Sequence, residues 1–462
     1  MSLSRRSFLA SAAALAAAPV LGAVPASGEV DVAIIGAGAA GIAAARRVAA
    51  AGRRFALIEA DDHIGGRCVT DMRTFGVPYD RGAHSIRLPD SNPIVKLAAK
   101  SGFDIYTAPA DQKVRVGRRN ARQGEMEDFL AVLVRSNRAI MEAARGKVDV
   151  SCANALPKDL GEWRATVEFM LGPYACTKDL AEVSAMDFAK AAERDTDAFC
   201  RQGYGALLAK AAAGIPVQLS TPAAHIEWGK GLEVETPKGR IGARAIIVTV
   251  STNVLAANTI KFTPELPRRQ LDAAAKLKLG TSERVVLELP GNPLGLHQDE
   301  LVFEKSENAR TAAMLANVSG TNLCHVNIAG RFGRDLSAQG EAAMVAFALD
   351  WLTGLYGTDM KKAVKRTQAT RWDSAPWVLG ASSAAAPGAQ SARRVLMEPL
   401  RDRLWFAGEA VHETLWGTVN GAWESGERAA EAALKKAGLL KEAPEPQRKP
   451  ARPRQRSIRF RR

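Results

Sequence analysis

The sequence lacks paired cysteines and lacks an apolar segment long enough to cross a membrane. Its five cysteines, Cys68, Cys152, Cys176, Cys200 and Cys324, are odd in number, and no two are spaced C-x-x-C. This spacing argues against both a disulfide framework and a zinc site, so buried free thiols are expected. No apolar run reaches the roughly 20 residues that a membrane-spanning helix needs. With 462 residues, of which 47% are hydrophobic, the chain is expected to fold into two soluble domains.

Positive charge is concentrated at one end of the chain. The formal net charge is +14, and removing eight basic residues of the tail leaves +6. These eight are Arg448, Lys449, Arg452, Arg454, Arg456, Arg459, Arg461 and Arg462. A Pro-broken basic tail from about residue 443 is expected to be disordered and solvated. The alternative is weak attachment to an anionic membrane surface or an acidic partner. Nucleic-acid binding is not indicated.

The first residues form a targeting pattern. Residues 4–9 contain a twin arginine, residues 10–21 are rich in alanine, and small residues follow at 23–26. This order is typical of the twin-arginine signal, which exports folded proteins. We therefore expect a signal peptide at 1–26 and a periplasmic mature protein. A disordered Ala-rich N-terminus is the alternative.

The chain is organised around residues 30–59. Residues 30–35 are apolar and mostly β-branched, which predicts a buried strand, and the run G-A-G-A-A-G follows at once. A helix is expected over 42–51 and a second strand over 55–58, ending at Glu59. Glycines in this position permit a tight turn, close approach of a pyrophosphate and close packing of helix on strand. The helix N-terminus attracts phosphate, and the acidic residue can bind a ribose. The pattern predicts dinucleotide binding.

Two further segments identify the dinucleotide. Residues 63–67, His-Ile-Gly-Gly-Arg, add a second glycine turn and an arginine, which suits a cofactor that stays bound. Residues 404–409, L-W-F-A-G-E, predict a strand, and residues 417–426 open the last helix. The whole run of residues 32–68, which ends with the first of these segments, resembles the FAD-binding start of the flavin amine oxidase and desaturase superfamily. The second resembles its C-terminal FAD signature. Together they resemble flavin-containing amine oxidases over about residues 30–433.

The resemblance implies an α/β fold, with a Rossmann-like FAD-binding domain and an inserted α+β substrate domain. The FAD-binding domain is expected at 29–91, 203–262 and 390–438, and the substrate domain at 92–202 and 263–389. The middle of the chain fits this plan, because a small meander at 226–236 and a buried strand at 244–250 precede the second insertion. Helices dominate the prediction for 92–199.

The resemblance also implies the residues that surround FAD. These are Gly36, Gly38, Ala40, Gly41, Glu59, Gly66, Arg67, Gly82, Ala83, His84, Ser85, Ala223, Trp372, Gly408, Glu409, Thr418 and Val419. In some members a cysteine bonds covalently to the flavin, but Ala381 and Ser382 stand at the corresponding positions. FAD is therefore expected to be non-covalent. No metal site is expected.

The expected reaction site departs from the family at two points. The strand at 279–289 carries Arg284 where many members have a lysine that holds a water near the flavin. Arginine stays protonated and reaches further, so it is not equivalent. Many members also have two aromatic side chains that form a cage around the substrate. Both are absent here, and Trp377 and Trp416 are the candidates to replace them. Arg284, Trp377 and Trp416 are therefore the candidate catalytic residues.

The implied activity is oxidation of the C–N bond of a small amine to an imine, which hydrolyses to an aldehyde or ketone. The flavin supplies the chemistry, and the protein supplies binding, orientation and electrostatics. Electrons are expected to pass to dioxygen or to a periplasmic acceptor. Two alternatives stay open. One is a C–C desaturase-type flavoprotein, and the other is an exported flavoprotein with a binding or electron-carrier role. The sequence does not specify the amine.

Overall fold

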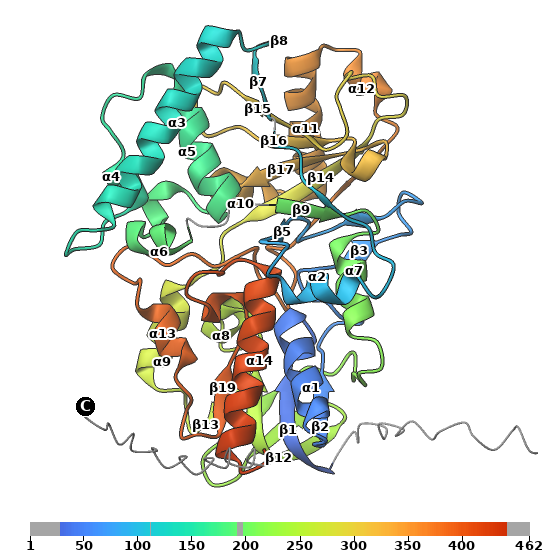
Figure 1. The fold of residues 1–462 in the computed structure, drawn as a ribbon, viewed down its shortest axis with the longest axis vertical. Helices are drawn as coiled ribbons and strands as arrows, with labels where there is room; N and C mark the ends of the chain where they lie inside the picture. The colour runs from blue at the N-terminus through green and yellow to red at the C-terminus, as the bar shows by residue number, and fades with distance from the viewer. Residues whose placement is uncertain (1–27, 111, 192–196, 441–462) are drawn as a thin grey trace, which may run out of the picture.

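The computed structural model describes residues 28–110, 112–191 and 197–440. The expected signal peptide and the basic tail lie outside these residues. Within them, no helix combines the length and the apolar character needed to cross a membrane. All five cysteines are buried thiols outside any disulfide, as expected. The described chain forms two lobes, each built on a large sheet (Figure 1).

The first sheet occupies the lower lobe in Figure 1 and has a parallel centre. Its strands, in spatial order, are β13 (Lys261–Thr263), β10 (His225–Glu227), β11 (Glu233–Thr236), β12 (Gly239–Val248), β1 (Gly28–Ile35) and β2 (Phe55–Ile58), and β19 (Leu404–Phe406) also pairs with β12. The central strands are buried on both faces, which is why their sequences read as continuous apolar runs. The strands and meander expected from the sequence are all present.

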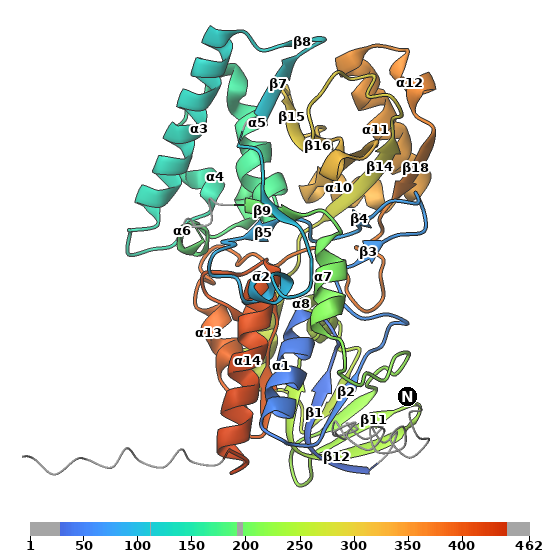
Figure 2. The same ribbon diagram turned by 45° about the vertical axis from the view of Figure 1, so that its right-hand side comes forward.

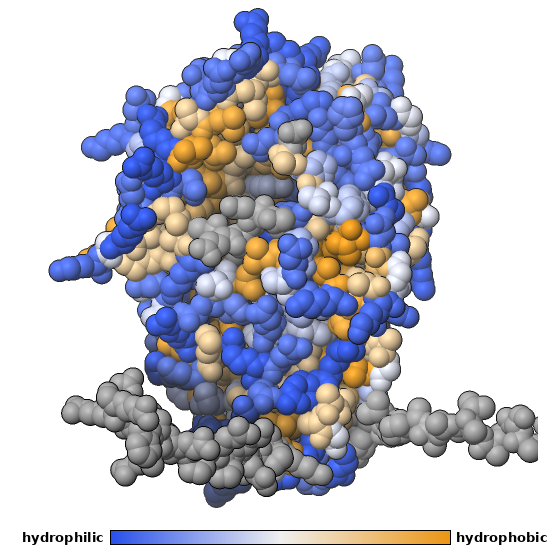
Figure 3. Space-filling model, in the orientation of Figure 1, coloured by the Kyte–Doolittle hydropathy of each residue, from blue (hydrophilic) through white to orange (hydrophobic). Residues whose placement is uncertain are grey.

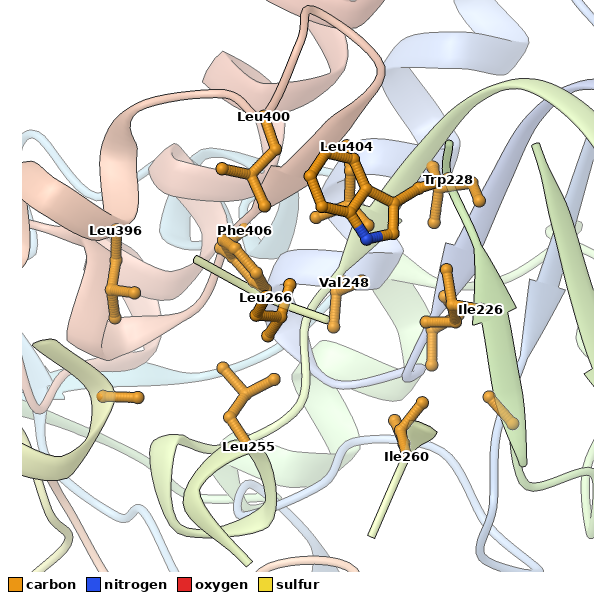
Figure 4. Close-up of a cluster of buried hydrophobic side chains, with 14 of the residues drawn as sticks. Ile226, Trp228, Val248, Leu255, Ile260, Leu266, Leu396, Leu400, Leu404 and Phe406 are labelled. Carbon is orange, nitrogen blue, oxygen red and sulfur yellow. The ribbon is translucent and has the colours of Figure 1, made fainter. Parts of the chain in front are cut away.

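Helices cover both faces of this sheet. On one face α1 (Ala39–Ala50) packs against α14 (Val419–Lys436), and Figures 1 and 2 both show the two helices side by side. On the other face lie α8 (Thr252–Ala256), α9 (Arg268–Lys276) and α13 (Ala392–Met397). Figure 4 shows the core there, where Val248 and Phe406 of the sheet gather with Leu255 and Leu396 of the helices. Each such side chain contributes about 2 kcal/mol on burial.

One expected domain boundary is displaced. The sequence placed the start of the second insertion at residue 263, ahead of α9. Leu266, Ala273, Ala274 and Leu277 instead belong to the core of the first sheet. The reason is that α9 packs its apolar side chains against α8, α13 and the face of the first sheet that they cover. The chain leaves the first lobe only after α9.

The second sheet forms the upper lobe. Its strands, in order, are β18 (Arg366–Ala369), β14 (Ser282–Glu288), β17 (Leu323–Ala329), β16 (Ala313–Ala316), β15 (Glu300–Glu304), β7 (Gln112–Val116) and β8 (Arg119–Asn120). One face packs on α10 (Gly330–Ser337) and α11 (Glu341–Tyr356) through residues such as Val285, Val326 and Ile328. Because side chains alternate along a strand, Arg284, His325 and Asn327 belong to the opposite face.

The remaining elements lie outside the two large sheets. The strands are β3 (Thr70–Asp71), β4 (Tyr79–Asp80), β5 (Ile86–Arg87), β6 (Ile105–Thr107) and β9 (Asp197–Cys200). The helices are α2 (Pro93–Ala98), α3 (Gln123–Ala143), α4 (Cys152–Ala155), α5 (Arg164–Phe169), α6 (Ala185–Lys190), α7 (Tyr204–Ala211) and α12 (Met360–Ala363). Figure 3 shows apolar side chains gathered beside α3, next to a hollow of the surface. The largely helical prediction for 92–199 was wrong at β6–β9. The partners of β6, β7 and β9 are distant in sequence, as Leu301 opposite Gln112 illustrates, and β8 forms a short hairpin with β7.

Candidate active site

A cavity of about 310 Å³ runs between the two lobes. One end, here called the nucleotide end, is lined by Gly36, Gly38, Glu59 and Ala223 of the first lobe. The other end, here called the β14 end, is lined by Thr177, Ser282, Arg284, Asn327, Trp372 and Trp377. Between them lie Arg67, Gly82, Glu409 and Thr418. Segments from nearly the whole length of the described chain therefore meet in one cavity.

The three glycines of the first turn differ in what surrounds them. Gly36 has φ +101°, and a Cβ on it would lie 2.5 Å from Thr249 Oγ1. A Cβ on Gly41 would lie 1.8 Å from the carbonyl oxygen of Gly36, so the helix packs directly on the strand end. A Cβ on Gly38 would meet only Gly65 O, at 4.0 Å, and Gly38 faces the cavity. The backbone at Gly38 is thus open to a ligand, beside the first N–H groups of α1.

Glu59 closes the nucleotide end. It follows β2 and is 8% exposed. Its carboxylate accepts hydrogen bonds from Ala37 N (2.6 Å) and Asp61 N (3.0 Å). Burial raises the pKa of Glu59, although these backbone donors oppose the shift. Ala223 and its neighbours Thr221 and Pro222 line the wall at the same end of the cavity.

Arg67 and Glu409 brace the middle of the cavity. Arg67 Nη1 donates to Glu409 Oε1 (3.0 Å) and to the carbonyl oxygen of Ala381 (2.5 Å). Glu409 also accepts from Ser383 N, Ser383 Oγ and Gly417 N. Burial alone would raise the pKa of Glu409, but Arg67, Arg393 and these donors hold it below its usual range. The Glu409 carboxylate is therefore committed to protein donors, and what it offers a ligand is its backbone.

The N-terminus of α14 points into the cavity wall. Thr418 is its N-cap, with Oγ1 accepting from Gly421 N (3.0 Å). Thr418 and Val419 both line the cavity, and Gly417 precedes them with φ +69°. Helix N-termini favour negative charge, so α1 and α14 present two such ends to the same cavity. An elongated dinucleotide with a central pyrophosphate fits this arrangement, with the open backbone at Gly38 as its cradle.

The segment after β4 contributes Gly82 and Ala83 to the cavity wall, but not the two residues that follow them. Gly82 and Ala83 line the cavity, and a Cβ on Gly82 would lie 2.0 Å from Arg67 O. His84 and Ser85, expected to contact the cofactor, are not part of the wall. His84 is 7% exposed, its Nδ1 is 2.9 Å from Asp80 Oδ2, and its ring stacks on Phe199. The buried Asp80 carboxylate draws the imidazole away from the cavity.

Arg284 dominates the β14 end. Its Nη1 donates to the carbonyl oxygen of Asp80, and its Nε donates to Asn327 Oδ1 (3.3 Å). Burial lowers the pKa of Arg284, and the Asp80 carboxylate partly restores it. His325 lies beside it, 1% exposed and with no hydrogen-bond partner on either ring nitrogen. Burial, then the charge of Arg284, lowers the pKa of His325 well below 6.5, so this ring is neutral.

The tryptophans divide into two groups. Trp372 and Trp377 line the cavity, and Trp372 Nε1 donates to Arg81 O (3.1 Å). Trp416, a candidate cage residue, is instead 3% exposed in a core with Leu180 and Ala384. Its Nε1 donates to Asp187 O, and the Arg393 guanidinium lies 4.8 Å from its ring centroid. The buried Arg393–Asp187 pair holds Trp416 there, so its ring does not reach the reaction site.

Sequence reasoning missed several wall residues at the β14 end. Thr177 lines the cavity with φ +61°, and its Oγ1 lies 3.1 Å from Ser382 Oγ. It comes from a region whose short elements gave no signal for function. Asn327 was also missed, although its strand alternates polar His325 and Asn327 with apolar Cys324 and Val326. That alternation was the available signal for a polar, cavity-facing side.

The fold and the cavity together define a two-lobed protein with a cradle for a dinucleotide. The chain belongs to the family described as flavin containing amine oxidoreductase, which matches residues 39–434. Its cofactor is accordingly FAD. The family's fold is also the fold seen here, a mixed α/β architecture shared with solved amine oxidases.

Individual relatives are distant. Polyamine oxidase 3 of Oryza sativa subsp. japonica is 26% identical over 441 residues, which cover 86% of this chain and 88% of that protein. Lysine-specific histone demethylase 2 of Homo sapiens is 26% identical over 439 residues, covering 86% of this chain but 53% of that protein. The chain thus spans about half the length of the demethylases it matches. Cyclohexylamine oxidase from Brevibacterium oxydans superposes with a TM-score of 0.74 at 20% identity, covering 89% of this chain and all of that one.

Proposed function

We propose that this protein oxidises the C–N bond of a small amine to an imine, which water then hydrolyses to an aldehyde or ketone. The amine loses two electrons and two protons, and the electrons pass on to dioxygen or to a periplasmic acceptor. When bound, FAD supplies the acceptor for the hydride equivalent. The observation that carries the proposal is a single cavity that joins a dinucleotide cradle at Gly38 to a separate polar wall around Arg284.

The chain's own contribution is binding and orientation at the β14 end. Trp372 and Trp377 offer apolar walls, and such walls favour an uncharged amine because a buried ammonium without a partner is costly. The neutral His325 adds no charge to the wall. Relatives named for polyamine, putrescine and cyclohexylamine oxidation support a small amine as the substrate.

We infer that FAD is held without a covalent bond. Ala381 and Ser382, at the positions where a linking cysteine is found in some relatives, line the cavity and carry no thiol. Cys68 also lines the cavity, but burial raises the pKa of its thiol, with Asp80 adding to the shift. A thiol that stays protonated is a poor nucleophile. Acid precipitation tests this inference, since non-covalent flavin is released into the supernatant and covalent flavin stays with the pellet.

The activity is tested by anaerobic mixing of the purified flavoprotein with a panel of amines. Loss of the oxidised-flavin absorbance with one chemical class of amine supports the proposal, and admission of air then shows whether dioxygen restores the colour. A yellow protein that no amine bleaches would favour the electron-carrier alternative.

Export by the twin-arginine signal is a separate proposal. It is tested by fractionating cells that carry the wild-type chain or an Arg5→Lys, Arg6→Lys variant, since loss of the periplasmic form is expected only in the variant.

A further inference from the structure

The β14 end of the cavity carries positive charge. The guanidinium groups of Arg81 and Arg284 both belong to the wall. Arg81 lies against Trp372, with its Cζ 6.0 Å from the ring centroid. Among the described residues, neither arginine has a carboxylate oxygen within the 4.0 Å of an ion pair. The Asp71 and Asp80 carboxylates act on Arg81 and Arg284 from beyond ion-pair distance. Two cations outside any ion pair therefore face one cavity and favour an anion there.

The carboxylates of the cavity wall either lie at the nucleotide end or already accept hydrogen bonds from the protein. Glu59 and Asp61 belong to the nucleotide end, and Glu59 accepts from two backbone N–H groups. Glu409 is saturated by Arg67, Ser383 and Gly417. Within the described part of the wall, no carboxylate is therefore free to receive the second ammonium of a diamine. If a diamine bound with both ends charged, burying its second ammonium at the β14 end would cost free energy, because no ion-pair partner lies there.

The Asp80 carboxylate, which lies behind the wall, is also engaged. It accepts from His84, Thr70 Oγ1, Tyr204 N and Gly205 N. It is 1% exposed and absent from the cavity wall. It therefore moderates the field of Arg284 without offering an oxygen to a substrate.

The guanidinium of Arg284 is oriented for a ligand. Its Nη1 and Nε donate to Asp80 O and Asn327 Oδ1, which fixes the plane of the group. Among the described residues, Nη2 has no acceptor, and the amide nitrogen of Asn327 has no acceptor either. Guanidinium and amide donors side by side suit a carboxylate, because the planar arginine can donate more than one hydrogen bond to it.

We propose that the substrate of this protein is an amine that also carries a carboxylate, and that Arg284 binds that carboxylate with help from Asn327 and the nearby charge of Arg81. This inference rests on the amine oxidation proposed above and narrows it to one substrate class. It separates this protein from relatives whose names refer to polyamines and putrescine.

Binding is tested first, without turnover. The FAD-loaded protein is titrated with benzoate, benzamide and benzylamine under anaerobic conditions, and the shift of the flavin absorbance gives each dissociation constant. The three probes share a ring and differ in charge. Benzoate is expected to bind about tenfold or more tightly than benzamide, the size of effect expected of a charged hydrogen bond. Equal binding of benzoate and benzamide would overturn the proposal.

Variants locate the anion site. Arg284→Met is expected to remove the preference for benzoate, Arg284→Lys to retain part of it, and Arg81→Met to weaken it by a smaller factor. Arg268→Met is the matched control, because it removes the same charge from a side chain that is 88% exposed on α9. If Arg284→Met does not fold, the Arg284→Lys and Arg81→Met results carry the test. A benzoate preference that survives all three variants would contradict the assignment.

Turnover separates this inference from the proposed function. Anaerobic flavin reduction by phenylalanine is compared with reduction by phenethylamine, which lacks only the carboxylate. The expected result is a second-order rate constant for flavin reduction at least about tenfold higher for phenylalanine. Faster reduction by phenethylamine would leave amine oxidation standing and overturn the carboxylate inference. Tight benzoate binding with no flavin reduction by any amine would overturn amine oxidation and leave a carboxylate-binding site at Arg284.

Discussion

The two ends of the cavity are built by different means. At the nucleotide end, one contiguous segment supplies a backbone turn, a helix N-terminus and Glu59, and the recognition lies largely in main-chain geometry. At the β14 end, side chains from β14, β17 and the segment around Trp372 meet across long sequence separations. A backbone cradle tolerates little change and binds the same cofactor throughout a family. A wall of side chains can differ in charge while the fold stays the same, and here it carries Arg81 and Arg284.

The sharpest test of the backbone cradle is Gly38→Val. The new side chain would occupy cavity space, because only Gly65 O lies within 4 Å of the Cβ position. We expect bound FAD to fall by tenfold or more while the apoprotein keeps its thermal stability. Flavin content after gel filtration and a thermal melt measure the two effects. Gly124→Ala, in α3 with nothing within 4 Å of its Cβ position, is the control and should keep its flavin.

Replacing a tryptophan of the cavity wall and one of the core should change different properties, substrate binding in the first case and stability in the second. Trp416→Ala should destabilise the fold by about 3–5 kcal/mol, because it empties a buried site under Arg393. Trp377→Ala should leave stability nearly unchanged and raise the KM for the substrate, since Trp377 faces the cavity. Denaturant melts and steady-state kinetics on both variants give the comparison. A Trp416→Ala protein with native stability and altered substrate preference would refute the placement of Trp416 in the core.

Glu409 joins the two ends, and its charge can be removed without changing its shape. Glu409→Gln should cost about 3 kcal/mol of stability at neutral pH, because Arg67 loses its buried partner. The folded-state pKa of Glu409 lies below the ordinary value of 4.5, so its charged form stabilises the fold above about pH 4.5. That contribution is lost as pH falls through the folded-state pKa. Urea melts from pH 7 to 3 should show the two proteins converging in stability on the acid side.

The smallest effect is expected at the mouth of the nucleotide end. Asp61, Asp62 and His63 lie close enough to share a metal ion, but Asp62 is exposed and the other two are only half-buried. Dialysis against a chelator should leave flavin content and amine oxidation unchanged. Loss of either on chelation, restored by a divalent cation, would show that the nucleotide end depends on more than its backbone.

The predictions that succeeded from sequence are those that depend on local chemistry. The turn after β1, the strand β2 and the start of α14 follow from glycine spacing and apolar runs within a few residues. The β7 and β8 strands were missed because β7 is completed by β15, almost 200 residues later. His84 and Trp416 were misplaced for a related reason. Phe199, which stacks on His84, and Arg393, which lies over Trp416, are brought to them only by the tertiary fold, although the partner Asp80 of His84 is near in sequence.

The packing of α1 against α14 sets the order in which the protein can become functional. A Cβ on Gly426 would lie 2.0 Å from Ala40 O, and Arg47 Nε donates to Glu431 (2.7 Å), so the first and last helices fit as one unit. The pyrophosphate cradle at Gly38 precedes its supporting helix, which begins only at Val419. A nascent chain therefore cannot hold its cofactor until α14 has been made. Shortening the chain by a single late stop codon within α14 should abolish flavin loading even though every residue at the nucleotide end has been made.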